Sequence, residues 1–139
     1  MNQDEEQLRL LSIFHYVVGG IAGLFACFPI IHLVVGVFLL YAARQPAGRG
    51  ETPPPEIMGW IFIAIASIII LLGWAFAICV IVAGRYLARR THYNFCLVMA
   101  AIECIFMPFG TALGVFTLIT LTRDSVKRLF AEYRDYQAT

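Results

Sequence analysis

The sequence predicts an all-α, polytopic integral membrane protein with about four transmembrane helices. Hydrophobic residues make up 60% of the 139 residues and charged residues only 14%. Residues 10–43 and 57–84 contain no Asp, Glu, Lys or Arg, and residues 93–122 contain only Glu103. Each stretch exceeds the roughly 20 residues that span a hydrocarbon core about 30 Å thick. A soluble domain of this length needs more polar residues, so we expect a single membrane domain, residues 1–139, in contact with the lipid bilayer.

Residues 10–43 form the first apolar run, which would reach about 50 Å as one straight helix. Pro29 removes a backbone donor and clashes with the preceding turn, so it predicts a helix break. The run is either one long kinked span or two short arms around a turn. Gly19 and Gly23 have the spacing that lets another helix approach closely. Acidic residues 4–6 precede the run, which argues against a cleaved signal peptide.

A loop and a second span follow. Residues 44–56 are rich in Pro and Gly, which predicts an irregular, stiff connector. Residues 57–84 are uninterrupted and apolar, so they predict one crossing. Gly73 lies near the middle of this predicted span and offers a second face for close helix packing.

Basic residues flank the last apolar run on both sides. The segment 85–92 carries no acidic residue and is predicted to be a cytoplasmic loop, because cytoplasmic loops are enriched in Lys and Arg. Residues 123–139 alternate apolar and charged positions at helical spacing, which predicts an amphipathic cytoplasmic tail helix. The residues expected at the lipid headgroups on this side are Arg85, Arg89, Arg90, Arg123, Lys127 and Arg128.

Residues 93–122 must then cross an even number of times, so they are predicted to form a helical hairpin. Pro108 and Gly110 place its turn at residues 107–110, and Gly110 and Gly114 allow close packing of helices. Arms of about 14 residues would be about 21 Å long, short for a full crossing. The hairpin either thins the bilayer or returns without reaching the far face. Both chain ends are then cytoplasmic; if residues 10–43 also form a hairpin, there are five crossings and the amino terminus is outside.

The order of residues in two apolar segments is also informative. The order FCLVMAAIECIFMPFGTALGVFTLITL in the last run, with FPIIHLVVGVFLL in the first, resembles a group of small multi-pass bacterial membrane proteins with no assigned activity. The likeness is most specific in the ECIFMPFGT part. It implies location in a bacterial inner membrane, and it carries no activity or ligand to this chain.

Three polar residues inside the apolar runs are candidates for a functional site: Glu103, His32 and His15. A carboxylate in hydrocarbon is costly, so Glu103 is expected to be protonated, paired or turned to a polar cavity. It could cap the hairpin, line an ion or proton path, or lie between subunits. By analogy between the two helix breaks, His32 is a possible partner for Glu103.

The sequence excludes several classes of function. It contains no catalytic motif, no phosphate-binding loop and no cofactor signature. The four cysteines lack metal-ligand spacing, and a net charge of +1 gives no nucleic-acid signature. We therefore expect a non-enzymatic structural or assembly subunit that packs through its glycine faces into a homo-oligomer or a larger membrane complex. The alternative is a small transporter or channel with a polar path through Glu103 and His32.

Overall fold

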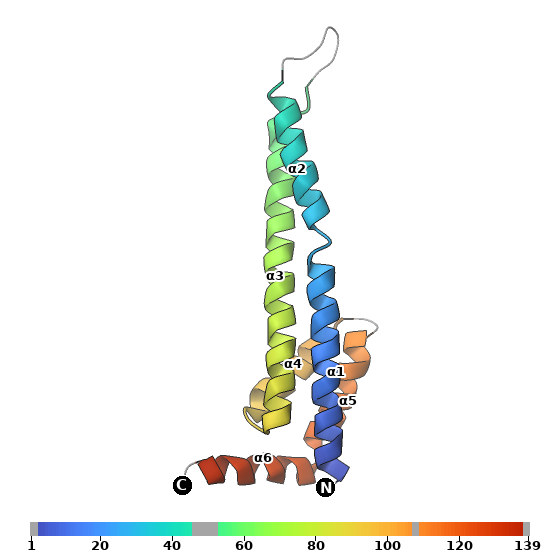
Figure 1. Cartoon of the computed structure of the whole chain (residues 1–139), viewed down its shortest axis with the longest axis vertical. Helices are drawn as coiled ribbons and strands as arrows, with labels where there is room; N and C mark the ends of the chain where they lie inside the picture. Colours follow the sequence, from blue (N-terminus) through green and yellow to red (C-terminus); the bar gives the residue numbers. More distant parts are fainter. Residues whose placement is uncertain (1–2, 46–52, 107–108, 138–139) are drawn as a thin grey trace. The chain divides into compact units, whose positions relative to one another are not determined.

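The computed structural model describes residues 3–45, 53–106 and 109–137, and every regular element in these ranges is an α-helix. The order is α1 (Gln3–Ala26), α2 (Ile30–Ala43), α3 (Glu56–Arg89), α4 (Tyr93–Glu103), α5 (Phe109–Thr122) and α6 (Asp124–Gln137) (Figure 1). The predicted all-α class is therefore confirmed. Two helical segments, Gln3–Ala43 and Glu56–Arg89, are long and apolar enough to cross a membrane.

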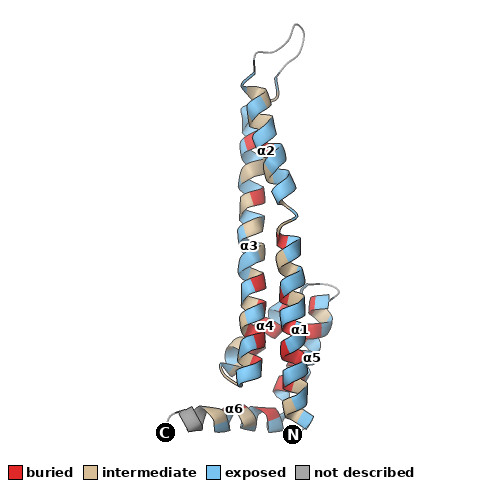
Figure 2. Cartoon of the chain, viewed as in Figure 1, coloured by how far each residue is buried: buried red, intermediate tan, exposed pale blue. Residues whose placement is uncertain are grey.

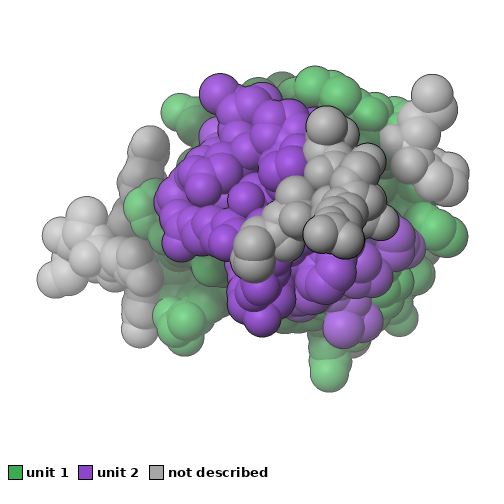
Figure 3. Space-filling view, turned by 90° about the horizontal axis from the view of Figure 1, so that it is seen from above, with its two compact units in different colours: residues 1–21, 76–139 green, residues 22–75 purple. Residues whose placement is uncertain are grey.

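The chain divides into two compact units, coloured separately in Figure 3. Unit 1 comprises residues 1–21 and 76–139, and unit 2 comprises residues 22–75. Unit 1 therefore contains the start of α1, the end of α3, and all of α4, α5 and α6. Unit 2 contains the end of α1, all of α2 and the first part of α3.

In unit 2 the helical path is interrupted at Pro29, between the end of α1 and the start of α2. The amide of Phe28 donates to the carbonyl of Phe25 (3.0 Å), and that of Ile30 donates to Cys27 (3.0 Å). These bonds reach back three residues instead of four, so one tighter turn replaces the α-helical pattern. A three-residue turn, residues 27–29, therefore connects α1 to α2.

Two glycines bring α2 and α3 together in unit 2. A Cβ added to Gly36 would lie 3.1 Å from the carbonyl oxygen of Gly59, and one added to Gly59 would lie 3.0 Å from that of Gly36. The two backbones are thus in direct contact. Most other side chains of α2 are half-buried or exposed, as the tan and pale blue ribbon in Figure 2 shows.

In unit 1, α4 and α5 pack against each other and are joined across a short turn. The amide of Phe106 donates to the carbonyl of Glu103 (3.0 Å), and the hydroxyl of Thr111 donates to the carbonyl of Cys104 (2.9 Å). The turn begins at Cys104, and Gly110 already belongs to α5. The prediction of a turn at residues 107–110 was therefore wrong for Phe109 and Gly110, which belong to α5, and residues 107–108 lie outside the described residues. Pro108 lies outside the described residues.

The basic segment 85–92 is mostly helix, so its prediction as a loop was wrong. α3 continues to Arg89. It ends where the amide of Thr91 donates to the carbonyl of Tyr86 (3.0 Å) and the amide of Arg90 donates to that of Leu87 (3.3 Å). These are the two bonds of a Schellman motif, whose left-handed position is usually glycine. Arg90 occupies it with a φ of 55°.

The apolar face of α6 is covered by protein. Val126 and Phe130 are buried in a cluster with Leu8, Leu87, Cys96 and Leu121. The ring of Phe130 meets that of Tyr93 edge to face, with ring centroids 5.6 Å apart. The sequence indicated an amphipathic tail helix, and the structure has a helix here whose Val126 and Phe130 pack against other residues of unit 1.

Candidate functional site: a buried histidine–glutamate pair

Unit 1 brings together two of the polar residues that the sequence singled out. Glu103 is the last residue of α4, and His15 lies in the middle of α1. The Nε2 atom of His15 is 3.3 Å from the Oε2 atom of Glu103, and both side chains are 0% exposed. Two ionisable groups from distant parts of the sequence thus meet in the interior of one unit. The proposed pairing of His32 with Glu103 was wrong, because the partner of Glu103 is His15.

The approach of α1 to α3 in unit 1 depends on Gly84. A Cβ at Gly84 would lie 2.8 Å from the Cβ of His15 and 3.1 Å from the carbonyl oxygen of Ser12. The hydroxyl of Ser12 donates to the carbonyl of Gly84 over 2.7 Å, and this bond is buried. One turn further along, a Cβ at Gly19 would meet Ile81 (2.6 Å) and the carbonyl of Ala77 (3.3 Å). Close helix packing therefore fixes where His15 stands.

The ring of His15 is oriented by its own helix. Its Nδ1 atom lies 2.8 Å from the carbonyl oxygen of Leu11, one turn earlier. A carbonyl oxygen can only accept a hydrogen bond, so Nδ1 must carry the hydrogen. This bond leaves Nε2 to face Glu103.

Glycines on α5 seat the end of α4. A Cβ at Gly110 would lie 2.6 Å from the carbonyl oxygen of Glu103, and one at Gly114 would lie 2.5 Å from that of Ala100. Gly110 and Gly114 thus act within the hairpin. Because α5 lies directly against the last turn of α4, the backbone of Glu103 has little freedom to move the carboxyl group away from His15.

The polar atoms of the pair are incompletely satisfied. At 3.3 Å the contact is longer than the 2.7–2.9 Å typical of a strong charge-assisted hydrogen bond. Within the described residues, neither His15 Nε2 nor either carboxyl oxygen of Glu103 has a well-oriented hydrogen bond. A buried polar atom without a partner is costly and is uncommon in folded proteins. The pair therefore combines deep burial with unused hydrogen-bonding capacity.

His32 has a different setting. It is exposed and belongs to unit 2, where it lines an apolar cavity of about 310 Å³ with Pro29, Ile61, Phe62, Ile65, Ala66 and Ile69. The lining offers it no second ionisable group. In the part of the chain that the structure describes, no three His, Cys, Asp or Glu residues are grouped so as to hold a metal ion.

The remaining predicted packing residues are placed as follows. A Cβ at Gly73 would lie 2.8 Å from the Cβ of Ala26. The carbonyl of Gly23 accepts a bond from the thiol of Cys27 at 3.5 Å. Sequence reasoning missed Gly36, Gly59 and Gly84. Gly36 and Gly59 have no small residue four positions away, whereas Gly84 and Ala88 have the same spacing as Gly73 and Ala77, so this pattern could have identified Gly84.

Some of the basic residues predicted at the headgroups pair with acidic residues of the chain. Arg90 pairs with Glu5 at 2.8 Å, and Arg123 approaches Asp4 at 3.8 Å. Lys127 pairs with Asp124 on its own helix at 3.2 Å. Arg85, Arg89 and Arg128 are exposed. The charges of Arg90 and Arg123 thus hold the amino-terminal end of α1 within unit 1.

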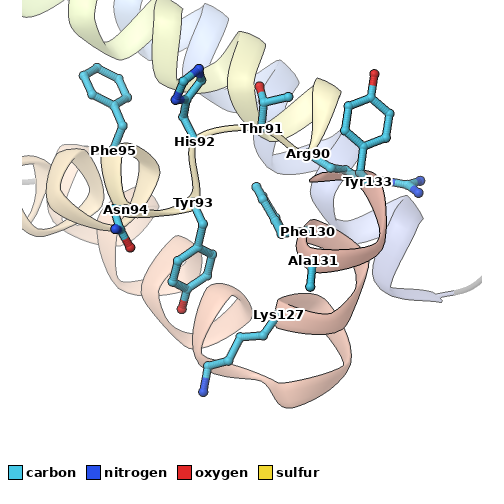
Figure 4. Close-up of a pocket in the computed structure, with 10 residues that line it drawn as sticks. All are labelled: Arg90, Thr91, His92, Tyr93, Asn94, Phe95, Lys127, Phe130, Ala131 and Tyr133. Atoms are coloured by element: carbon cyan, nitrogen blue, oxygen red, sulfur yellow. The ribbon is translucent and has the colours of Figure 1, made fainter. Parts of the chain in front are cut away.

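A cavity of about 590 Å³ lies beside these basic residues. It is lined by the connection between α3 and α4 and by one side of α6, with aromatic and basic side chains around it (Figure 4). His92 in this connection has a φ of 51°, so two non-glycine residues within three positions are left-handed. Two basic groups of the lining, Arg90 and Lys127, already have carboxylate partners.

No known protein family, curated protein or solved structure matches this chain.

Proposed function

We propose that the chain is a multi-pass protein of a bacterial inner membrane that acts as a structural or assembly subunit. The observation that carries this proposal is the exposure of its most apolar helices. The best 18-residue windows of Gln3–Ala43 and Glu56–Arg89 have mean hydropathies of 2.4 and 2.9, yet only 11% and 17% of their residues are buried. A helix in the core of a soluble protein would be mostly buried, whereas lipid covers apolar side chains that the protein leaves open.

The lengths of the helices favour a particular topology. The segments Gln3–Ala43 and Glu56–Arg89 contain 41 and 34 residues, more than a crossing requires. With 11 and 14 residues, α4 and α5 would be about 17 and 21 Å long. We therefore propose two full crossings and a hairpin that enters and returns on the same side. The exposed Arg85, Arg89 and Arg128 favour the cytoplasm for that side.

The surface available to a partner is formed by apolar side chains and not by the glycines. Among the glycines that the structure describes, a Cβ added to any of seven would lie 3.1 Å or less from another atom of the chain; these include Gly19, Gly73 and Gly114. Side chains such as Leu71 and Leu72, by contrast, are 70% and 66% exposed. In this proposal the partner is a second copy of the chain or a larger membrane complex that contacts these exposed helix faces.

Fractionation and cross-linking test the proposal. We expect the protein to remain in vesicles washed with alkaline carbonate, and to need detergent for extraction. A single cysteine replacing Leu72 in a background without the four native cysteines should cross-link to a partner in the membrane, while one replacing the buried Val80 should not. Recovery in the soluble fraction without detergent would refute membrane insertion. Equal cross-linking at the two positions, or none at either, would refute assembly through this face.

Transport is the second candidate, and the buried His15–Glu103 pair is the observation that favours it. Ionisable groups inside a membrane protein often mark ion or proton paths. In this alternative His15 replaces His32 as the companion of Glu103. Proton flux into liposomes that Glu103→Gln abolishes would support transport. Absence of flux together with a defined oligomer would support assembly.

A further inference from the structure

We propose that the cavity between the α3–α4 connection and α6 binds the phosphate group of an anionic membrane lipid (Figure 4). All the residues that line it belong to unit 1. The site goes beyond the assembly role proposed above. Only the choice of a lipid as the source of the phosphate rests on the proposed membrane location.

The size and the apolar wall of the cavity suit a lipid headgroup. Its volume of about 590 Å³ lies within the range of about 300–1,000 Å³ that is usual for small-molecule sites. A single phosphate ion would leave most of this space empty. The hydroxyl of Tyr93 donates to the carbonyl of Leu121 over 2.9 Å, and its ring meets the buried Phe130 edge to face. These contacts fix the apolar wall before any ligand binds.

The polar side of the cavity favours an anion. Arg90 and Lys127 line it, and none of the described lining residues is acidic. The contact of Arg90 with Glu5 uses its Nη2 atom, so other N–H groups of the guanidinium remain available. The side chains of Lys127 and its partner Asp124 are 49% and 87% exposed. Solvent-exposed pairs of this kind are weak, so a phosphate can compete for the ammonium group.

The first turn of α4 also lines the cavity and adds backbone donors. The amides of Phe95 and Cys96 donate to the carbonyl of His92, at 3.0 and 3.2 Å. Among the described residues, the amides of Tyr93 and Asn94 have no such acceptor, and the side chain of His92 does not cap the helix. The start of a helix carries a partial positive charge that attracts phosphate. This charge acts on the same space as the two basic side chains.

The position of the cavity along the chain favours a lipid as the source of the phosphate. Residues 57–84 of α3 contain no charged side chain. At about 1.5 Å per residue, Arg90 lies about 9 Å beyond Gly84 along the chain. The polar headgroup layer borders the hydrocarbon core at this distance. In the proposed topology, the cavity therefore lies at the depth of the lipid phosphates.

Lipid binding to the full-length protein in an uncharged detergent tests this inference. Native mass spectrometry counts bound lipids as phosphatidylglycerol is added, and so gives the dissociation constant of the first lipid. Lys127→Gln removes a cation of the cavity. Arg128→Gln is the matched control, because Arg128 is the next residue of α6, is exposed and does not line the cavity.

We expect Lys127→Gln to raise the dissociation constant about ten-fold, through the loss of one charge-assisted hydrogen bond. Arg128→Gln should raise it by less than about two-fold, because an exposed charge outside the site is largely screened. Equal effects of the two changes, or no effect of either, would overturn the site, since binding would then follow total charge or none.

A second pair of variants tests the space without changing the charge, and it decides the question if Lys127→Gln loses its helical circular dichroism. Ala131 lines the cavity and is exposed, so Ala131→Phe fills the cavity from its rim. Ser125→Phe places the same side chain on an exposed position of α6 outside the lining. We expect only Ala131→Phe to weaken lipid binding. Equal binding by these two variants would overturn the site.

Two other ligands identify the source of the phosphate. Glycerol 3-phosphate carries the phosphate without acyl chains, and phosphatidylcholine carries it beside a compensating cation. Tighter binding of phosphatidylglycerol than of either supports the proposal. Equally tight binding of glycerol 3-phosphate would refute a lipid as the occupant, and equally tight binding of phosphatidylcholine would refute the preference for an anionic lipid. Membrane insertion is measured separately by carbonate extraction, so the two proposals can fail independently.

Discussion

Replacing Gly84 with alanine tests the packing on which the buried pair depends. In an ordinary helix, alanine is favoured over glycine by about 1 kcal/mol. Here the new methyl group would lie 2.8 Å from the Cβ of His15 and 3.1 Å from the carbonyl oxygen of Ser12. Neither atom is the end of a flexible side chain, so α1 must move away from α3. Overpacking of this kind costs about 1–3 kcal/mol.

The same movement strains the hydrogen bond from Ser12 to Gly84, which is worth about 1 kcal/mol. Summing these terms, we expect Gly84→Ala to lower the free energy of unfolding by about 1–3 kcal/mol. Gly20→Ala is the matched control, because a Cβ at Gly20 meets nothing within 4 Å. That change should be neutral or stabilising by up to about 1 kcal/mol.

The assay is reversible unfolding in mixed micelles, followed by the helical circular dichroism signal as denaturing detergent is added. The difference between the two alanine variants is the decisive quantity, since both add the same methyl group to an α-helix. Equal stabilities of Gly84→Ala and Gly20→Ala would refute the close contact between α1 and α3 at Gly84. The reasoning about how His15 is positioned would fail with it.

Three other changes probe separate contacts. Gly114→Ala places a methyl group 2.5 Å from the carbonyl oxygen of Ala100. In the same unfolding assay it should destabilise the α4–α5 hairpin by about 1–3 kcal/mol. Ser12→Ala removes a buried donor to Gly84, and it should cost about 1–3 kcal/mol because the carbonyl is left without that partner. Leu72→Arg puts a charge on a side chain that is 66% exposed near the middle of α3. It should reduce the membrane-inserted fraction, since arginine at a helix centre costs about 2.5–3.5 kcal/mol, whereas a soluble helix would accept it unchanged.

Local chemistry made parts of the fold predictable from the sequence. Pro29 lacks a backbone donor, and the helical hydrogen bonds are interrupted beside it in the structure. Glu103 stood out as the one acid in a long apolar run, and it is fully buried. The spacing of Val126 and Phe130 indicated an amphipathic helix, and both residues lie on the covered side of α6. Each of these inferences used only neighbours in the sequence.

Other features depend on what lies opposite an element, which periodicity does not reveal. The apolar side of α6 could face lipid or protein with the same pattern, and contacts with Tyr93 and other residues of unit 1 decide it. The density of basic residues at 85–92 indicated a side of the membrane, but arginine also favours helices, and α3 continues to Arg89. The charge pattern of this segment therefore did not determine the conformation of its backbone.

The partner of Glu103 shows where sequence reasoning stops. His15 and His32 were both candidates, and analogy between the two helix breaks favoured His32. The structure selects His15 because Gly84 has no side chain where α1 approaches α3, and because the Leu11 carbonyl turns the Nε2 atom toward the hairpin. The spacing of Gly84 and Ala88 is that of a helix-packing face, but it does not say which residue of which helix lies opposite, so the contact with His15 becomes visible only in three dimensions. The position of His15 thus depends on a residue that carries no functional group, and for this reason Gly84→Ala and Glu103→Gln should act differently. The first displaces His15, while the second keeps the helix packing and changes only the carboxyl group.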